Sequence, residues 1–128
     1  MNVIRGSQIR FIPAAHEDAN NPGVLKRVLA TRDDLLGGRV QMLNWARLPG
    51  GRAFRPHYHE DMQEVFVIIS GQARMRVDDE TVLLAAGDAI VVDPRQVHEM
   101  ENDTDRDVDY IVFGITLDQG GRTVVVEP

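Results

Sequence analysis

Three histidines and one glutamate are spaced so that they could bind one metal ion. His57 and His59 are two positions apart, Glu64 follows five residues later, and His98 lies further along the chain. Side chains two positions apart on a β-strand point to the same side. Neutral imidazoles and a carboxylate are ligands of divalent ions such as Zn, Ni, Mn or Fe. We therefore predict a metal site with these four ligands, and the sequence leaves the identity of the metal open.

The elements that must position these ligands are β-strands. Glycine, proline, asparagine and aspartate recur at short intervals and separate short runs rich in Val, Ile and Leu, which is typical of an all-β sandwich or barrel. We expect strands at residues 24–30, 39–48, 55–59, 64–70, 73–77, 81–84, 89–92, 98–101, 107–114 and 123–126. A helical turn is expected only at Thr31–Leu36, with Thr31 or Asp33 as its cap.

Alternation along these strands assigns residues to faces. Glu64, Phe66 and Ile68 share the side that would face the metal, and Val108, Tyr110 and Val112 share one face of a later strand. Apolar residues also occupy the opposite faces, so one side would pack against a second sheet or a second subunit. Whether residues 41–47 present their odd or their even side chains to the interior stays open.

The same alternation nominates residues for a pocket beside the metal, namely Arg55, Phe66, Met100 and Tyr110. Arg55 has the parity of the histidine pair and could hold a substrate carboxylate or phosphate, or could be a surface arginine paired with a nearby acid. Tyr110 could donate a hydrogen bond or a proton, and it is the one candidate catalytic residue that we name.

Composition bounds the class of protein. The 128 residues suffice for one domain, with a core at about residues 39–114 and further strands as N- and C-terminal extensions. The net charge of −6 argues against a nucleic-acid or anionic membrane surface. No cysteine is present, which excludes disulfides and thiolate ligands. No apolar run resembles a signal peptide or a membrane span, so we expect a cytoplasmic protein.

Two motifs resemble those of the cupin superfamily. The first motif, Gly-x5-His-x-His-x3,4-Glu-x6-Gly, is matched at Gly51, His57, His59, Glu64 and Gly71. The second motif is matched at Gly87, His98 and Asn102. It departs from the family at the turn, where Asp93 and Arg95 stand in place of the usual proline and glycine. The departure alters one loop and leaves all four ligands in place.

The resemblance implies a double-stranded β-helix, or jelly-roll barrel, with a metal inside, and a homodimer. It favours a metal-dependent enzyme that acts on a small organic acid or sugar-like molecule, as a dioxygenase with Fe(II), or as an isomerase, lyase or decarboxylase with Zn, Ni or Mn. A non-catalytic module that binds or senses a small ligand is the alternative, and a purely structural metal is a third reading.

Three further features have two readings each. Acidic residues occupy six successive odd positions and would form a solvated outer face or a cation site, namely Glu99, Glu101, Asp103, Asp105, Asp107 and Asp109. Trp45 would pack in the core or stack on a ring-shaped substrate. His16 lies in a polar loop, and we expect it to be solvated, with a role in a lid as the other reading.

Overall fold

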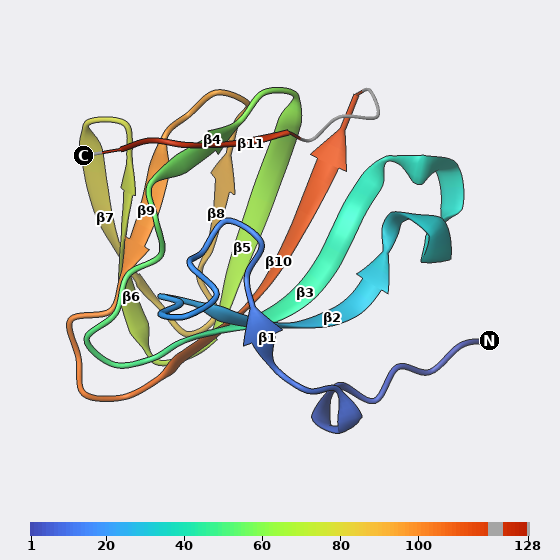
Figure 1. The fold of residues 1–128 in the computed structure, drawn as a ribbon, viewed down its shortest axis with the longest axis horizontal. Helices are drawn as coiled ribbons and strands as arrows, with labels where there is room; N and C mark the ends of the chain where they lie inside the picture. The colour runs from blue at the N-terminus through green and yellow to red at the C-terminus, as the bar shows by residue number, and fades with distance from the viewer. Residues whose placement is uncertain (118–121, 128) are drawn as a thin grey trace.

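Strands make up most of the ordered structure in the computed structural model, which describes residues 1–117 and 122–127 (Figure 1). The strands are β1 Ile12–Pro13, β2 Leu25–Thr31, β3 Val40–Leu48, β4 His57–His59, β5 Met62–Ser70, β6 Gln72–Val77, β7 Glu80–Ala85, β8 Ala89–Val92, β9 His98–Glu101, β10 Val108–Thr116 and β11 Thr123–Val125. All ten predicted strands are present, with each end within two residues of its expected place. Only the two-residue strand β1 was not expected.

Helical structure in the described residues is limited to three short 3₁₀ turns, η1 Gly6–Gln8, η2 Arg32–Asp34 and η3 Leu36–Gly38. The expected helical turn corresponds to η2 and η3, and Thr31 is its cap. The backbone N–H and the hydroxyl of Thr31 both donate to Asp34, at 2.8 and 3.0 Å. No helix among the described residues is long and apolar enough to cross a membrane.

The strands form two antiparallel sheets. The six-stranded sheet has the order β1-β2-β3-β10-β5-β8, and the five-stranded sheet has the order β11-β4-β9-β6-β7. The two sheets enclose one hydrophobic core to which both contribute, for example Phe66 and Tyr110 from one and Met75 and Met100 from the other. The second sheet covers the inward apolar face of these strands, and the predicted all-β fold is confirmed. Outward apolar residues such as Ile69 and Val91 stay exposed, so the expected second subunit stays a prediction.

Strand β3 resolves the parity that the sequence left open. Its even positions, Asn44, Ala46 and Leu48, are buried toward the interior. Trp45, at an odd position, lies on the other face, where its ring is edge-on to Phe11 and its indole N–H donates to Asp109 at 3.0 Å. Trp45 consequently lies neither in the buried core nor on the cavity wall, so both readings of this residue are wrong.

The acidic residues at odd positions from Glu99 to Asp109 are mostly exposed, as expected, but arginines on a neighbouring strand pair with two of them. Arg76 pairs with Glu99 at 2.8 Å, and Arg74 pairs with Asp103 at 3.0 Å. Asp109 is the exception because it is buried and accepts two hydrogen bonds from Arg47, at 2.8 and 2.9 Å. These bonds and the one from Trp45 outweigh the effect of burial and lower the pKa of Asp109. The prediction of a fully solvated face is wrong at this position.

The unusual turn of the second motif keeps a conformation suited to glycine. Arg95 has φ of 69°, in the left-handed region that residues with a Cβ rarely adopt. Its backbone N–H donates to the carbonyl of His59 at 2.8 Å, which ties this turn to the end of strand β4. The substitution of glycine by arginine therefore changes the chemistry of the turn and preserves its path.

Asn102, the last residue of the second motif, holds the loop that leads into β10. Its side chain is fully buried, and its amide donates to the carbonyls of Leu48 and Arg106 at 3.0 and 2.6 Å. Its Oδ1 accepts the backbone N–H of Thr104 at 3.0 Å. We expect Asn102→Ala to lower the free energy of unfolding by about 2–4 kcal/mol, because it leaves several buried polar groups unpaired. Urea denaturation measures this change.

The control for this variant is Asn20→Ala. Asn20 is exposed, and its substitution should change the free energy of unfolding by less than about 0.5 kcal/mol. Equal stability of Asn102→Ala and Asn20→Ala would contradict the role given to the Asn102 amide.

Candidate metal centre

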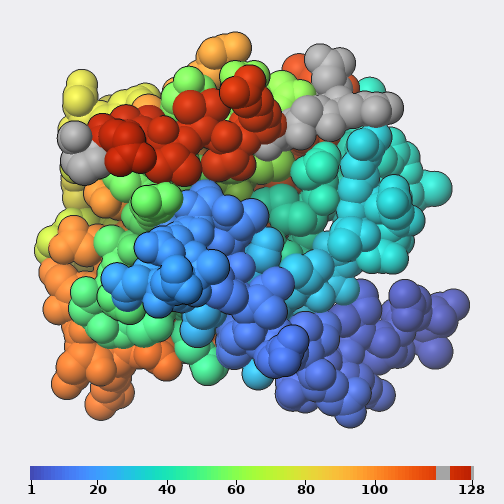
Figure 2. Space-filling model, in the orientation of Figure 1, coloured from blue at the N-terminus to red at the C-terminus, as the bar shows by residue number. Residues whose placement is uncertain are grey.

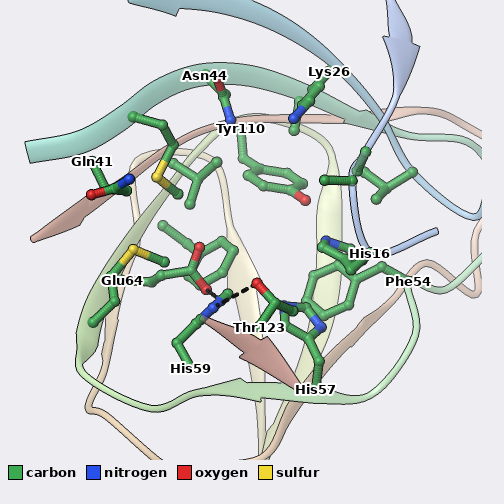
Figure 3. Close-up of a pocket in the computed structure, with 18 residues that line it drawn as sticks. His16, Lys26, Gln41, Asn44, Phe54, His57, His59, Glu64, Tyr110 and Thr123 are labelled. Carbon is green, nitrogen blue, oxygen red and sulfur yellow. Dashed lines mark hydrogen bonds and ion pairs between the residues drawn. The ribbon is translucent and has the colours of Figure 1, made fainter. Parts of the chain in front are cut away.

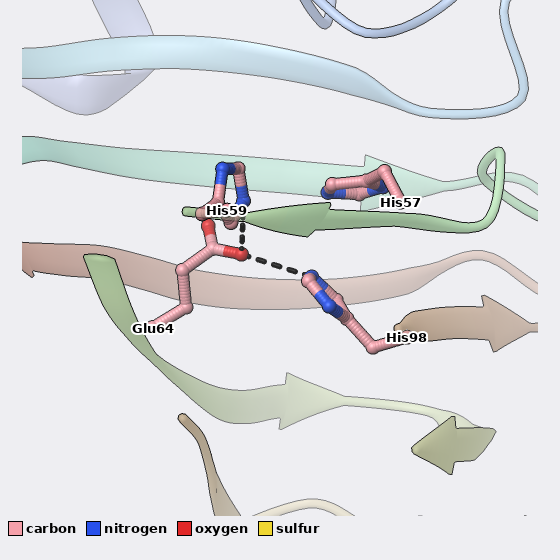
Figure 4. A group of neighbouring side chains, drawn as sticks. All are labelled: His57, His59, Glu64 and His98. Carbon is pink, nitrogen blue, oxygen red and sulfur yellow. Dashed lines mark hydrogen bonds and ion pairs between the residues drawn. The ribbon is translucent and has the colours of Figure 1, made fainter. Parts of the chain in front are cut away.

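The four predicted ligands come from three strands and from both sheets. His57 and His59 lie on β4, His98 lies directly opposite His57 on β9, and Glu64 lies on β5 of the other sheet. Alternation turns both β4 histidines inward while Tyr58 between them faces the other way. All four side chains are buried, and they converge in the interior (Figure 4).

The geometry of the four residues suits one ion. Their potential ligand atoms all lie within 4.8 Å of one another. Nitrogen and oxygen ligands bind divalent ions at about 2.0–2.2 Å, so two ligands of one ion are at most about 4.4 Å apart. Small side-chain adjustments would therefore bring all four onto a common centre, and the donor set of three imidazoles and one carboxylate fits Zn, Ni, Mn or Fe.

Glu64 connects the two sheets in this centre, because its carboxylate contacts histidines of the opposite sheet. Its Oε1 lies 2.8 Å from Nε2 of His59 and 3.0 Å from Nε2 of His98. Burial raises the pKa of the Glu64 carboxyl, but the close contacts with the rings of His59 and His98 outweigh it, so its pKa is lowered. The carboxylate is consequently ionised and available as a ligand at neutral pH.

Hydrogen bonds on the outer nitrogens orient the rings. Nδ1 of His57 lies 2.7 Å from the carbonyl of Arg55, and Nδ1 of His98 lies 3.0 Å from the carbonyl of Gln96. A carbonyl only accepts, so both Nδ1 atoms carry the proton and both Nε2 atoms are directed inward. Nδ1 of His59 lies 3.0 Å from the hydroxyl of Thr123 on β11. Such outer contacts are typical of histidines that bind metals.

His98 carries the sharpest evidence that the centre suits a cation. Both of its ring nitrogens face acceptors, the carbonyl of Gln96 on one side and the carboxylate of Glu64 on the other. A neutral imidazole has only one N–H and can satisfy only one of them. A second ring proton would satisfy both acceptors, and so would a divalent cation bound between Nε2 and the carboxylate.

His57 is held in the neutral form that a metal ligand requires. Burial, together with the neighbouring His16 and His98, lowers the pKa of His57 to about 3. Phe54 packs against it with ring centroids 5.2 Å apart, and Phe66 lies 5.8 Å from the ring of His98. These aromatic rings shield the imidazoles from water, and the neutral ring of His57 need lose no proton when it binds an ion.

A cavity of about 360 Å³ adjoins the four residues (Figure 3). Three of them, His57, His59 and Glu64, form part of its wall. The volume lies in the range of pockets for small molecules, and both apolar and polar side chains line it. An ion bound by the four residues would therefore border a space that a small molecule could occupy.

The predicted pocket residues divide into two pairs. Phe66 and Tyr110 line the cavity, with their rings 5.6 Å apart. Met100 is fully buried on the inward face of β9, but it packs in the hydrophobic core and does not reach the cavity. The parity of Met100 is thus right and its predicted place in the pocket is wrong.

Arg55 is the second correction, because it is exposed and lies outside the cavity wall. The strand begins only at His57, so alternation does not extend back to Arg55, and Phe54 is the buried residue of this segment. The backbone N–H of Arg55 donates to Glu17 at 2.7 Å. The predicted contact of this arginine with a substrate at the barrel mouth is therefore not available in this structure.

Sequence reasoning missed several cavity residues, and His16 is the clearest. Its ring stacks on His57 with centroids 4.1 Å apart, and its Nδ1 lies 3.0 Å from Glu17. Glu17 also accepts the backbone N–H of Gly23, which fixes the loop. Figure 2 shows the segment of residues 12–23, in lighter blue, lying over this face of the barrel. The prediction of a solvated His16 is wrong, and no local sequence pattern predicts its place beside His57.

Lys26, Gln41, Asn44 and Thr123 also line the cavity and were not nominated. A signal existed for Lys26. It is the only lysine in the chain, and on a predicted strand it lies on the same face as Val24 and Val28. Thr123 had none, since its position depends on the pairing of β11 with β4, in which it lies opposite His59.

Comparison with known proteins identifies the family. The sequence model of the cupin domain family matches residues 44–114, which is more than half of the chain. The chain belongs to the cupin family. An uncharacterized protein of Methanocaldococcus jannaschii is 26% identical to this cupin over 102 residues, which cover 80% of this chain and 78% of that protein.

Solved structures confirm the jelly-roll barrel. A Thermotoga maritima protein named as a predicted oxalate decarboxylase has a TM-score of 0.81 and 23% identity, with 91% of this chain and 100% of that chain covered. The polyketide cyclase RemF of Streptomyces resistomycificus has a TM-score of 0.77 and 17% identity, with 99% and 87% covered. A sugar phosphate isomerase of Silicibacter pomeroyi has a TM-score of 0.75 and 19% identity, with 99% and 83% covered. At these identities the likeness concerns the fold.

The ligand set is tested by metal content. We expect the purified chain to bind one divalent ion, and His98→Ala to lower the metal-to-protein ratio several-fold, because one of four ligands and a partner of Glu64 is lost. Elemental analysis after exhaustive dialysis measures the ratio. His16→Ala is the matched control, since its ring touches His57 without belonging to the ligand set, and it should keep the ion.

Melting with and without a chelator separates a binding site from a structural one. Because the core is built from both sheets, we expect the barrel to remain folded without the ion and to melt at a lower temperature. Unfolding of the chain on chelation at room temperature would instead indicate a structural metal.

Proposed function

We propose that this cupin is a metal-dependent enzyme that binds one divalent ion through His57, His59, Glu64 and His98 and converts a small molecule held in the adjoining cavity. The observation that carries the proposal is His98, whose two ring nitrogens both face acceptors beside a cavity of about 360 Å³. An ion bound there would act as a Lewis acid that polarises an oxygen atom of the substrate.

The cavity offers polar groups beyond the ligand set, which favours catalysis over binding alone. Burial raises the pKa of Tyr110, so its phenol stays protonated at neutral pH and serves as a hydrogen-bond or proton donor. Among the described residues its hydroxyl has no hydrogen-bond partner, and it is free to contact a substrate. His16 lies over the ligand His57 with Nδ1 bound to Glu17, so its Nε2 is the second candidate for such a contact.

The type of reaction follows from the site only in outline. The structural neighbours carry the names of a decarboxylase, a cyclase and an isomerase, so the shared fold does not select one chemistry. The ligand set is compatible with a dioxygenase, an isomerase or a lyase. We propose one of these three types, with the choice depending on the metal and on the polar groups of the cavity.

Turnover by the reconstituted protein tests the proposal. The apoprotein is loaded separately with Zn, Ni, Mn and Fe(II), incubated with a panel of small organic and sugar acids, and the products are followed by mass spectrometry. We expect product with at least one metal and none with His98→Ala. A compound that binds tightly and is recovered unchanged with every metal would support the alternative, a non-catalytic binding or sensing module.

Tyr110→Phe tests the contribution of the phenol. Removal of a hydrogen-bond donor that acts on the reacting substrate should lower kcat/KM about 10–100-fold. The metal content should stay unchanged, because Tyr110 does not belong to the ligand set. Tyr58→Phe is the matched control, since Tyr58 lies on the outward face of β4, and wild-type kinetics are expected for it. Equal kinetics of both variants would remove Tyr110 from the mechanism.

A further inference from the structure

One wall of the cavity is polar and lies opposite the ligand histidines. Lys26 on β2, Asn44 on β3 and Tyr110 on β10 form it, and in Figure 3 they face His57 and His59 across the pocket. Strand register brings them together, because Ala46 pairs with both Lys26 and Tyr110 in one row across three strands. The small side chain of Ala46 leaves the space between the lysine and the phenol open.

The charge of Lys26 has no counterion in the described part of the chain. No ion pair or hydrogen bond to its ammonium is formed there, although Arg47 in the same sheet pairs with two carboxylates. Burial lowers the pKa of Lys26, which reflects the unfavourable removal of an ammonium from water. An anion bound in the cavity would compensate this charge.

Asn44 provides a second and independent sign of a ligand. Its side chain is only 7% exposed and lines the cavity, yet its Oδ1 is buried with no hydrogen-bond donor among the described residues. Buried polar atoms are nearly always paired. In Figure 3 the amide nitrogen of Asn44 points toward the cavity, and exchange of the amide N and O positions would turn Oδ1 there. A ligand that carries a hydroxyl group would then supply the missing donor.

We propose that the cavity binds a small hydroxy acid whose carboxylate pairs with Lys26 and whose hydroxyl donates to Asn44. The inference rests on the proposed function, of which it names the substrate class. It also assigns to Lys26 the role of carboxylate holder that the sequence suggested for Arg55. The other reading of Lys26 is a lysine that merely extends along apolar surface toward solvent, and that reading predicts no effect on ligand binding.

The test uses malate as a hydroxy acid and malamide as its uncharged analogue, with affinity measured by calorimetry on metal-loaded protein. Lys26→Met keeps the length of the side chain and removes its charge. We expect this variant to bind malate at least about ten-fold more weakly and to lose nothing toward malamide. Arg55→Met is the matched control, because Arg55 is exposed and lies outside the cavity, and its affinity for malate should equal that of the wild type.

The single lysine also gives a direct spectroscopic report. Protein made with ¹³Cε-labelled lysine should show one lysine signal, which shifts when malate is added and does not shift with malamide. Unchanged affinity of Lys26→Met together with an unshifted lysine signal would overturn the inference, as would the absence of any malate binding at millimolar concentration.

The same signal separates this inference from the proposed function. If the protein loads no metal, the proposed function fails. A malate-dependent shift of Lys26 in the metal-free protein would still support the carboxylate site. If metal loads and malate binds but Lys26→Met changes nothing, the metal site stands and the assignment of Lys26 is wrong.

The hydroxyl contact has its own test in the comparison of malate with succinate, which lacks the hydroxyl. We expect the wild type to prefer malate by about 3–10-fold, as one neutral hydrogen bond allows. Asn44→Leu should remove this preference. Equal affinity of the wild type for the two acids would overturn the role of Asn44.

Discussion

The contact of Glu64 with His59 and His98 is the interaction on which the functional architecture depends. It joins a carboxylate on the six-stranded sheet to two imidazoles on the five-stranded sheet, in an interior that otherwise holds mostly apolar side chains. Ionised groups are costly to bury unless they are paired. The barrel therefore needs a positive partner for Glu64. The histidines leave a place for one, because backbone carbonyls fix the outer nitrogens of His57 and His98 and the hydroxyl of Thr123 fixes that of His59.

The ligand set was predictable because it depends on strictly local rules. Alternation along one short strand fixes the direction of His57 and His59, and the turn that follows is long enough to start a new strand at Glu64. Strand positions were also predictable, since β-branched runs bounded by glycine, proline and aspartate mark them directly. Even the buried Asn102 follows from the second motif, although its four side-chain hydrogen bonds become visible only in the structure.

The rest of the site depends on contacts between distant segments. His16 reaches His57 only because Glu17 binds the backbone of Gly23 and Arg55 at the same time. Lys26 lines the cavity because β2 pairs with β3 in one particular register. Alternation failed at Arg55, where the strand has not yet begun, and it placed Met100 on the correct face but beyond the reach of the cavity. Single-sequence patterns carry no information on such register or depth.

The division of the cavity into two unlike ends has a consequence for specificity. The ligand end consists of the four candidate ligands, all within the part of the chain that matches the cupin domain, and an ion bound there would not by itself select a substrate. The opposite end is built from residues outside the two motifs, and it places the only lysine of an acidic chain where no described carboxylate neutralises it. A half-buried charge and a buried unpaired amide disfavour ligands that cannot satisfy them, since their desolvation is then not compensated. Under the proposed function, discrimination between substrates would accordingly depend on β2 and β3, whereas the chemistry available to a bound molecule would depend on β4, β5 and β9.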